Sequence, residues 1–316
     1  MSGVPDFFIV GHPKSGTTAL YETLAGHPQI FLPERKEPRW FASDLPSPYQ
    51  PRRSGEPGES FADYLALFAG ASPGQLTGDG STAYIWSRTA AGLIAEARPD
   101  ARIIAIFREP ASYLRSLHLQ LLQHKSEEVA SLREALALEP ERRLGRRLTE
   151  VNRDFPQVLL YSERVRYTEQ LRRYEEHFGR EQILVLIYDD FRADNDACVR
   201  RVERFLGIEE RGAPAGGNEA NPSLRRRVDL DNALHEAFFG GNGALRTARR
   251  AARLVVGQRA GARAFRTLRE KLVFASPGQA DPELTRELRL RFRGEVEALG
   301  EHLGRDLVAL WGYDQP

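Results

Sequence analysis

The chain has 316 residues, 41% of them hydrophobic and 28% charged, so it can form one large core or two modest ones, and it is neither collagen, coiled coil nor disordered. Its 45 basic and 44 acidic residues leave a net charge of +1, which gives no general reason to expect nucleic acid as a partner. The longest apolar runs, such as Ile103–Phe107, are far shorter than the roughly 20 residues that span a bilayer. One cysteine, Cys198, cannot form an internal disulfide, and no His/Cys cluster has zinc-ligand spacing. With no secretory signal at the start, we expect a cytoplasmic protein without a transmembrane segment or a metal.

The chain opens with a strand, a loop and a helix. Phe7–Val10 is a short continuous apolar run, and Thr17–Ala25 is typical of a helix. The same unit recurs at Ile103–Phe107 and at Ile183–Tyr188. The strand Ile183–Tyr188 is followed by Asp196–Leu206, where the apolar residues have helical spacing. Three buried-type strands, each followed by a helix, predict an α/β fold with a P-loop-type parallel sheet flanked by helices.

We expect residues 1–316 to form a single domain, with an α/β core over 1–210 and a mainly helical C-terminal extension over 211–316. The Pro/Gly/Ser-rich piece 33–58 and the polar helical piece 127–151 are predicted to be insertions on the sheet. The extension holds a basic segment, 225–271, with twelve Lys/Arg against four Asp/Glu. This segment is either a solvated helix face or a contact for an anionic partner, such as a carrier protein or a membrane surface.

The loop after the first strand has the composition of a phosphate-binding site. It reads Gly11-His12-Pro13-Lys14-Ser15-Gly16-Thr17-Thr18 and leads directly into the predicted helix. Backbone N–H groups at a helix start are unpaired and carry the positive end of the helix dipole, so they bind anions. The glycine spacing matches a nucleotide-binding P-loop, except that Thr17 replaces the lysine after the second glycine, and Lys14 precedes that glycine by two residues. His12 is expected to be a packing residue.

This loop and several later motifs together resemble the sulfotransferases that use 3′-phosphoadenosine 5′-phosphosulfate (PAPS). The later motifs are Lys36–Pro38, and Arg108–Pro110 with Ser116 eight residues past the arginine. Two further segments add to this: Gly74–Tyr84 is similar to the heparan sulfate type, and Gly179–Ile183 is similar both to that type and to its bacterial relatives. The resemblance extends over most of the chain and implies a sulfotransferase whose product from PAPS is adenosine 3′,5′-bisphosphate.

The resemblance also implies how the cofactor is held, without a metal. Lys14 would approach the oxygen that bridges phosphate and sulfate, where negative charge grows as the bond breaks. Arg108 and Ser116 would hold the 3′-phosphate, because a guanidinium fork and a hydroxyl suit that dianion. The full predicted cofactor-binding set is Pro13, Lys14, Ser15, Gly16, Thr17, Thr18, Arg108, Ser116, Tyr161 and Arg226. Of these, Tyr161 could equally be a packed tyrosine, and Arg226 belongs to a run of three arginines, next to a loop, that could close over a phosphate.

Transfer to a hydroxyl also needs a base that removes the acceptor proton. Glu37 occupies the position that resembles the catalytic glutamate of the heparan-type enzymes; the alternative is a loop glutamate paired with Lys36 or Arg39. Trp40 is a candidate for acceptor binding, since it lies in the predicted insertion, and Lys36 either steers the acceptor or is solvated. Asp79 is either a substrate-binding residue, an orienting partner of Lys14, or a buried structural carboxylate. The heparan-type pattern has lysine and proline where this chain has Gly80 and Thr82, so the acceptor site departs from that pattern.

A P-loop kinase or NTPase that phosphorylates a small molecule is the alternative function, because Ile183–Asp190 looks like a Walker B strand. Such enzymes need Mg²⁺ and a cation on the β- and γ-phosphates, and Thr17 in place of the usual lysine argues against this. The predicted function is therefore transfer of a sulfuryl group from PAPS to a hydroxyl of a saccharide or small metabolite. The identity of the acceptor is not readable from the sequence.

Overall fold

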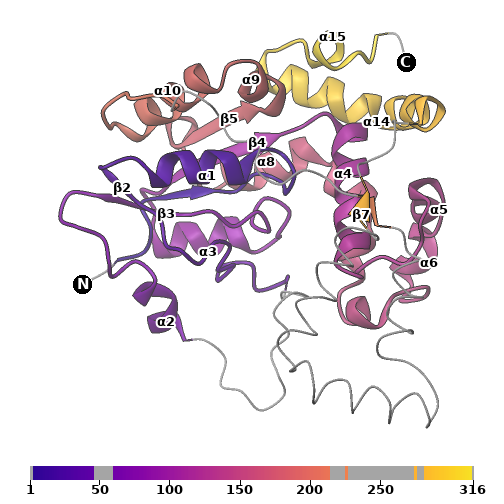
Figure 1. Ribbon diagram of the computed structural model, residues 1–316, viewed down its shortest axis with the longest axis horizontal. Helices are drawn as coiled ribbons and strands as arrows, with labels where there is room; N and C mark the ends of the chain where they lie inside the picture. The colour runs from indigo at the N-terminus through magenta and orange to yellow at the C-terminus, as the bar shows by residue number, and fades with distance from the viewer. Residues whose placement is uncertain (1–2, 46–59, 214–224, 227–273, 276–280, 315–316) are drawn as a thin grey trace, which may run out of the picture.

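A computed structural model of the chain describes residues 3–45, 60–213, 225–226, 274–275 and 281–314 (Figure 1). Within these ranges, the central sheet has five parallel strands in the order β2-β3-β1-β4-β5. The predicted parallel sheet flanked by helices is thereby confirmed. The strands are β1 (Phe7–Ile9), β2 (Ile30–Phe31), β3 (Leu76–Asp79), β4 (Arg102–Phe107) and β5 (Ile183–Ile187).

Side chains of the central strands are buried on both faces of the sheet. In β1, Phe7 and Ile9 join one buried cluster, while Phe8 and the following Val10 join the other. The side chains of β4 alternate between the same two clusters. Successive side chains of a strand point to opposite faces, so a strand covered on both sides is apolar without interruption. This is why the continuous runs in the sequence identified these strands.

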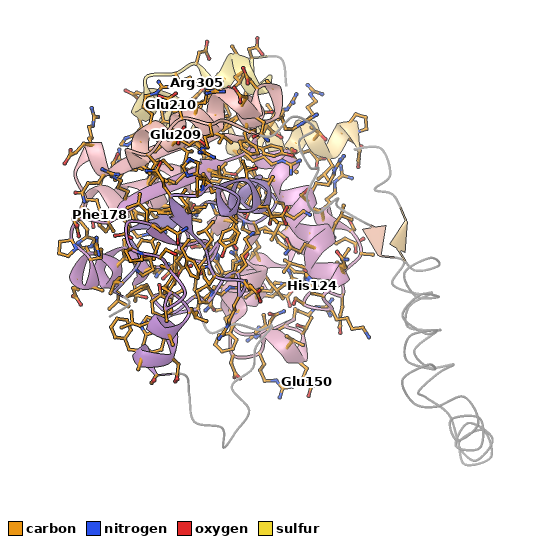
Figure 2. All side chains as sticks on the ribbon, turned by 60° about the vertical axis from the view of Figure 1, so that its left-hand side comes forward. His124, Glu150, Phe178, Glu209, Glu210 and Arg305 are labelled. Carbon is orange, nitrogen blue, oxygen red and sulfur yellow. The ribbon has the colours of Figure 1, made fainter. Side chains whose placement is uncertain are left out.

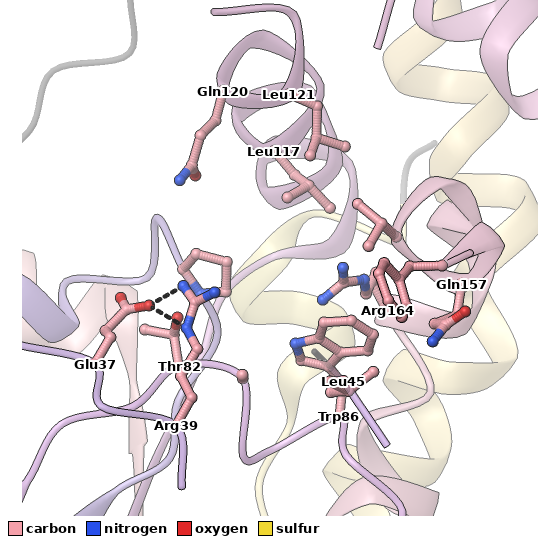
Figure 3. A pocket seen from close by; sticks show the side chains of 14 residues that line it. Glu37, Arg39, Leu45, Thr82, Trp86, Leu117, Gln120, Leu121, Gln157 and Arg164 are labelled. Carbon is pink, nitrogen blue, oxygen red and sulfur yellow. Dashed lines mark hydrogen bonds and ion pairs between the residues drawn. The ribbon is translucent and has the colours of Figure 1, made fainter. Parts of the chain in front are cut away.

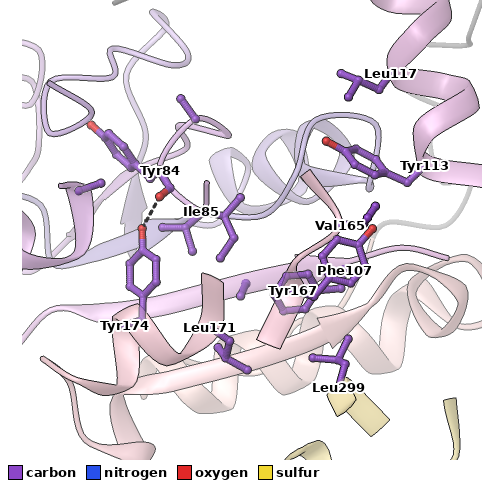
Figure 4. Close-up of a cluster of buried hydrophobic side chains, with 14 of the residues drawn as sticks. Tyr84, Ile85, Phe107, Tyr113, Leu117, Val165, Tyr167, Leu171, Tyr174 and Leu299 are labelled. Atoms are coloured by element: carbon purple, nitrogen blue, oxygen red, sulfur yellow. Dashed lines mark hydrogen bonds between the residues drawn. The ribbon is translucent and has the colours of Figure 1, made fainter. Parts of the chain in front are cut away.

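Helices cover each face of the sheet. The face of Phe7 and Ile9 packs against α1 (Thr17–Ala25), α9 (Tyr188–Ala193) and α10 (Asn195–Leu206). Figure 4 shows the opposite cluster, in which Phe107 of β4 lies among Tyr167, Leu171 and Leu299. The helices on that side are α3 (Ala90–Ala97), α4 (Pro110–Gln123), α8 (Tyr167–Glu175), α14 (Pro282–Leu303) and α15 (Leu307–Trp311).

The remaining described elements are short. The expected strand Ile183–Tyr188 ends one residue early, because Tyr188 begins α9. The predicted insertion 127–151 contains two helices. Most of the basic segment 225–271 lies outside the described residues. The short elements are α2 (Phe61–Ala66), α5 (Leu132–Ala137), α6 (Glu139–Arg143), η1 (Glu150–Asn152), η2 (Pro156–Leu159), α7 (Tyr161–Arg164), η3 (Arg180–Gln182), β6 (Arg225–Arg226) and β7 (Phe274–Ala275).

The described part of the C-terminal extension packs onto the core. Side chains of α14 and α15 belong to the same buried cluster as one face of the sheet. The hydroxyl of Tyr313 donates to Oε1 of Glu109 at 2.8 Å, and Glu109 in turn accepts hydrogen bonds from the backbone of Ala111 and Ser112 at the start of α4. The extension therefore supports the junction between β4 and α4. No helix in the described ranges is both long enough and apolar enough to cross a membrane.

Candidate active site

The loop between β1 and α1 lies at the carboxyl end of the sheet, where the strand order reverses. The chain leaves β1 toward β2 and β3 and later returns to β4 on the other side, and such a switch point is where open α/β sheets bind ligands. Gly11 lets the loop approach β4, because a Cβ there would lie 2.7 Å from the backbone nitrogen of Ile106. Gly16, with φ of 87°, ends the loop and provides no side chain to bond the first amides of α1. Those amides are available to an anion.

Three cations from separate segments gather at this loop. The guanidinium of Arg108 donates to the backbone carbonyl of Lys14 at 2.7 Å and to Oγ of Ser116 at 3.3 Å. The ammonium of Lys36 donates to Oγ1 of Thr18 at 2.5 Å. Burial and the neighbouring Arg108 lower the pKa of Lys14, and burial lowers the pKa of Lys36. Five of the predicted site residues are thus brought together around the start of α1.

Ser15 supplies an independent sign of a ligand at this loop. Its side chain is fully buried, and its hydroxyl oxygen has no hydrogen-bond partner within the described part of the chain. Buried polar groups are nearly always hydrogen-bonded, so an orphaned hydroxyl inside a phosphate-type loop marks a position for a group that the protein itself does not supply. The residues present therefore fit an anionic ligand.

Glu37 lies in the loop after β2, in backbone geometry that few residues adopt. Both Glu37 and Arg39 have φ of 59°, in the left-handed region. The guanidinium of Arg39 donates to Oε2 of Glu37, with Nε at 3.1 Å and Nη2 also in contact. This pair holds the carboxylate beside the loop that carries Lys14. Left-handed geometry at two non-glycine residues needs support from the surroundings.

Asp79 provides that support. Its Oδ1 accepts a hydrogen bond from the hydroxyl of Ser81 at 2.7 Å, and Oγ of Ser81 accepts the backbone N–H of Arg39 at 3.0 Å. Its Oδ2 accepts hydrogen bonds from the hydroxyls of Tyr64 at 2.9 Å and Tyr84 at 2.8 Å. Asp79 is fully buried, and burial raises its pKa to about 6 against the effect of these hydrogen bonds. The structure therefore places Asp79 behind the loop of Glu37, among its supporting residues.

A pocket connects the phosphate-type loop to Glu37 (Figure 3). Pro13 of the loop, Glu37 and Arg39 are among its lining residues. The other walls combine apolar side chains with the amides of Gln120 and Gln157. These walls consist of Leu45, Thr82, Ala83, Trp86, Leu117, Gln120, Leu121, Phe155, Gln157, Val158 and Arg164.

Several lining residues were not predicted from the sequence. The guanidinium of Arg164 lies over the ring of Trp86, 3.1 Å from its centroid, although the two are far apart in the sequence. Leu117, Gln120 and Leu121 could have been found, because their spacing places them on one face of α4. Trp40, which was predicted to contact the acceptor, is not among the described lining residues. Its indole packs against the rings of Tyr64 and Phe61.

His12 and Tyr161 lie in buried polar networks. Nε2 of His12 lies 2.7 Å from Oε1 of Gln170, and burial lowers its pKa to about 3, so the imidazole stays neutral and acts as the expected packing residue. The hydroxyl of Tyr161 donates to Oε2 of Glu127 at 3.0 Å, and Glu127 forms an ion pair with Arg142 at 2.8 Å. The structure does not bring Tyr161 to the loop, and its cofactor role stays a prediction. The backbone of β6, which contains Arg226, contacts α4, the helix of Ser116.

The acidic pair after β5 faces the C-terminal extension. Oδ2 of Asp189 accepts the indole N–H of Trp311 at 2.9 Å, and Oδ1 of Asp190 accepts Nη2 of Arg305 at 2.7 Å. Figure 2 shows Arg305 at the end of the molecule where α9 and α10 lie. Among the described side chains, no group of three or more His, Cys, Asp or Glu is gathered as metal ligands would be. The two acidic residues of the segment that resembles a Walker B strand are thus engaged by Trp311 and Arg305.

Fold and site together describe an α/β protein of the P-loop-like type, with a phosphate-type loop beside a pocket that Glu37 lines. The chain belongs to the sulfotransferase family, whose model matches residues 5–64 and 82–211. A sulfotransferase crystal structure from Alicyclobacillus acidocaldarius is 25% identical, with a TM-score of 0.66, over 97% of this chain and 98% of that one. Human carbohydrate sulfotransferase 15 is 47% identical over 38 residues, which are 12% of this chain and only 7% of that protein.

Proposed function

We propose that this sulfotransferase moves a sulfuryl group from PAPS, in line, to a hydroxyl of a saccharide or small metabolite and releases adenosine 3′,5′-bisphosphate. The observation that carries this proposal is the pocket itself, because Pro13 of the phosphate-type loop and Glu37 line the same space. Family membership supports sulfuryl transfer in general. The kinase alternative is disfavoured, since Asp189 and Asp190 are bound by Trp311 and Arg305.

On the donor side, the proposal assigns the first amides of α1 and the hydroxyls of Thr17 and Thr18 to the 5′-phosphate. Pro13, Ser15 and Gly16 shape the loop around it. PAPS supplies the activated sulfuryl group when bound. The ammonium of Lys14 would then stabilise the negative charge that develops on the departing phosphate oxygen, a task for which a compact point charge is suited.

The 3′-phosphate is assigned to a second group of residues. Arg108 and Ser116 contact one another and lie at the end of β4 and on α4. The strand β6 lies against the same helix, which keeps Arg226 a candidate for this phosphate. Tyr161 remains the weakest member of the predicted set, because its hydroxyl is engaged with Glu127.

On the acceptor side, Glu37 would take the proton of the attacking hydroxyl as the new S–O bond forms. Arg39 holds its carboxylate, and the Asp79 network fixes the backbone on which both stand. The pocket offers apolar surface together with amide groups, and Oε1 of Gln120 is buried without a hydrogen-bond partner among the described residues. Such a mixture suits a molecule with both C–H faces and hydroxyls, as a saccharide has. We further expect a cytoplasmic, single-domain enzyme.

The experiment that tests the donor is a thermal-shift comparison of adenosine 3′,5′-bisphosphate with ATP plus Mg²⁺. A ligand that binds the native state stabilises it by about 2.7 kcal/mol at a concentration of 100 times its Kd. We expect the bisphosphate to raise the Tm and ATP with Mg²⁺ to have little effect. A shift with ATP and Mg²⁺ alone would support the kinase and overturn the proposal.

A further inference from the structure

Lys36 is held over the first turn of α1, although it belongs to a different loop. Its ammonium donates to Oγ1 of Thr18 at 2.5 Å and lies 5.6 Å from the ring centroid of Tyr21, one turn further along the helix. Thr18 is the second residue of α1, directly after the phosphate-type loop. Since its hydroxyl oxygen accepts from Lys36, its own proton is directed elsewhere and can be donated to an anion.

Tyr21 also determines which segment can bring a cation to this place. A Cβ at Gly80 would lie 2.5 Å from the Tyr21 ring, so a side chain at this position would require the ring to move, and Gly80 stands where the heparan-type pattern has a lysine. The Tyr21 hydroxyl donates to the carbonyl of Pro33 at 2.5 Å, which ties the ring to the loop that carries Lys36. The Tyr21 ring thus occupies the space that a lysine at position 80 would need, and it lies beside Lys36 instead.

The electrostatic setting of Lys36 favours an anionic ligand. Burial lowers its pKa, while Glu37 and Glu22 act in the opposite direction and favour the charged form. Lys14 and Arg108 stand at the same loop, so an anion bound there would meet three cations. A charge held in a partly buried place gains most from a counter-ion within contact distance.

We propose that Lys36 contacts the phosphosulfate group of the donor and is a second catalytic cation beside Lys14, with Tyr21 as its positioning residue. This inference rests on the proposed function and replaces the predicted role of Lys36 in acceptor binding. In the reaction, the bond between sulfur and the bridging oxygen breaks, and its electron pair stays on the phosphate. A bond between sulfur and the acceptor oxygen forms, and Glu37 takes the acceptor proton. Lys36 neutralises the charge left on the phosphate.

The test is isothermal titration calorimetry with adenosine 3′,5′-bisphosphate, which keeps the 5′-phosphate and lacks the sulfuryl group. We expect Lys36→Met to raise its Kd by about tenfold or more, because a hydrogen bond to a charged group is lost. Lys36→Arg should restore part of the affinity. The matched control is Arg146→Met, which removes an exposed cation far along the chain and should change the Kd by less than about twofold.

One further measurement and one further variant make the outcome decisive. The Tm of each variant without ligand shows whether folding is intact. Tyr21→Phe removes only the bond to Pro33, so it should raise the Kd less than Lys36→Met does. If the wild-type protein binds the bisphosphate and Lys36→Met binds it equally well, Lys36 does not contact the donor. If the wild-type protein fails to bind it, the proposed function falls, and this inference falls with it.

Discussion

Two groups of polar side chains around α4 are organised in opposite ways. In the buried cluster after the helix, Glu127 and Arg142 form an ion pair at 2.8 Å, so the two charges cancel. In the donor cluster before the helix, Lys14, Lys36 and Arg108 come from three segments and carry the same sign. These three cations cannot neutralise one another.

The difference distinguishes a structural network from a candidate binding site. A buried ion pair whose partners are both hydrogen-bonded satisfies itself and fixes the packing around it. Like charges that share a site raise each other's free energy, and a bound anion removes that cost. Removing a member of the donor cluster should therefore alter ligand binding or turnover. Removing a member of the buried cluster should alter stability.

The largest effect is expected in the donor cluster from Lys14→Ala. Turnover should fall by roughly 10³-fold, because the charge on the leaving oxygen loses its stabilising ammonium. The Kd of adenosine 3′,5′-bisphosphate should rise far less. The measurement is kcat with an acceptor that the wild-type protein sulfates, and Arg146→Ala is the control. Turnover within tenfold of the wild type would remove Lys14 from the mechanism.

Glu37→Gln should lower kcat by about 10²-fold or more, since the amide cannot accept the acceptor proton. Because glutamine keeps the shape and can still meet Arg39, the Tm and the Kd of the bisphosphate should stay close to the wild-type values. Steady-state kinetics at saturating PAPS gives kcat. Full activity of this variant would show that another group is the base.

Arg108→Ala should weaken binding of adenosine 3′,5′-bisphosphate by about 10- to 100-fold, because a charged donor to the 3′-phosphate is lost. AMP lacks that phosphate and is the matched ligand. The affinity for AMP should change little in Arg108→Ala. A loss of affinity that both ligands share would reflect the lost contact of Arg108 with the Lys14 carbonyl. Equal losses for the two ligands would place the 3′-phosphate elsewhere.

The smallest effect is expected in the buried cluster from Tyr161→Phe. Removing this hydroxyl leaves Glu127 with one donor fewer, so the free energy of unfolding should fall by about 1–2 kcal/mol. Urea denaturation measures this loss. The Kd of the bisphosphate should stay within about twofold of the wild-type value. A weakening of fivefold or more would show that Tyr161 belongs to the donor site.

Much of the fold was predictable because it depends on local patterns. The continuous apolar runs correctly predicted β1, β4 and β5. The strands β2 and β3 were missed, since β2 has two residues and β3 reads Leu-Thr-Gly-Asp, without an apolar run or a clear alternation. Their pairing is decided by neighbours in the sheet, which the sequence does not show.

In the candidate site, too, some residues could be predicted from the sequence and others could not. Lys14 and Thr18 were readable because they are adjacent in a loop with a known physical role at a helix start. The position of Lys36 was not, because it depends on the Tyr21 ring and on the carbonyl of Pro33. The support that Asp79 gives to the backbone of Arg39 passes through Ser81, and such a relay has no sequence signature.

The bond from Tyr313 to Glu109 joins residues 204 positions apart, at the point where β4 passes into α4. Chain closure over such a separation has an entropic cost that grows with loop length, and contacts of this kind form slowly. Glu109 directly follows Arg108, so the start of α4 is supported from a distant part of the chain, and a protein shortened before Tyr313 would lose this bond.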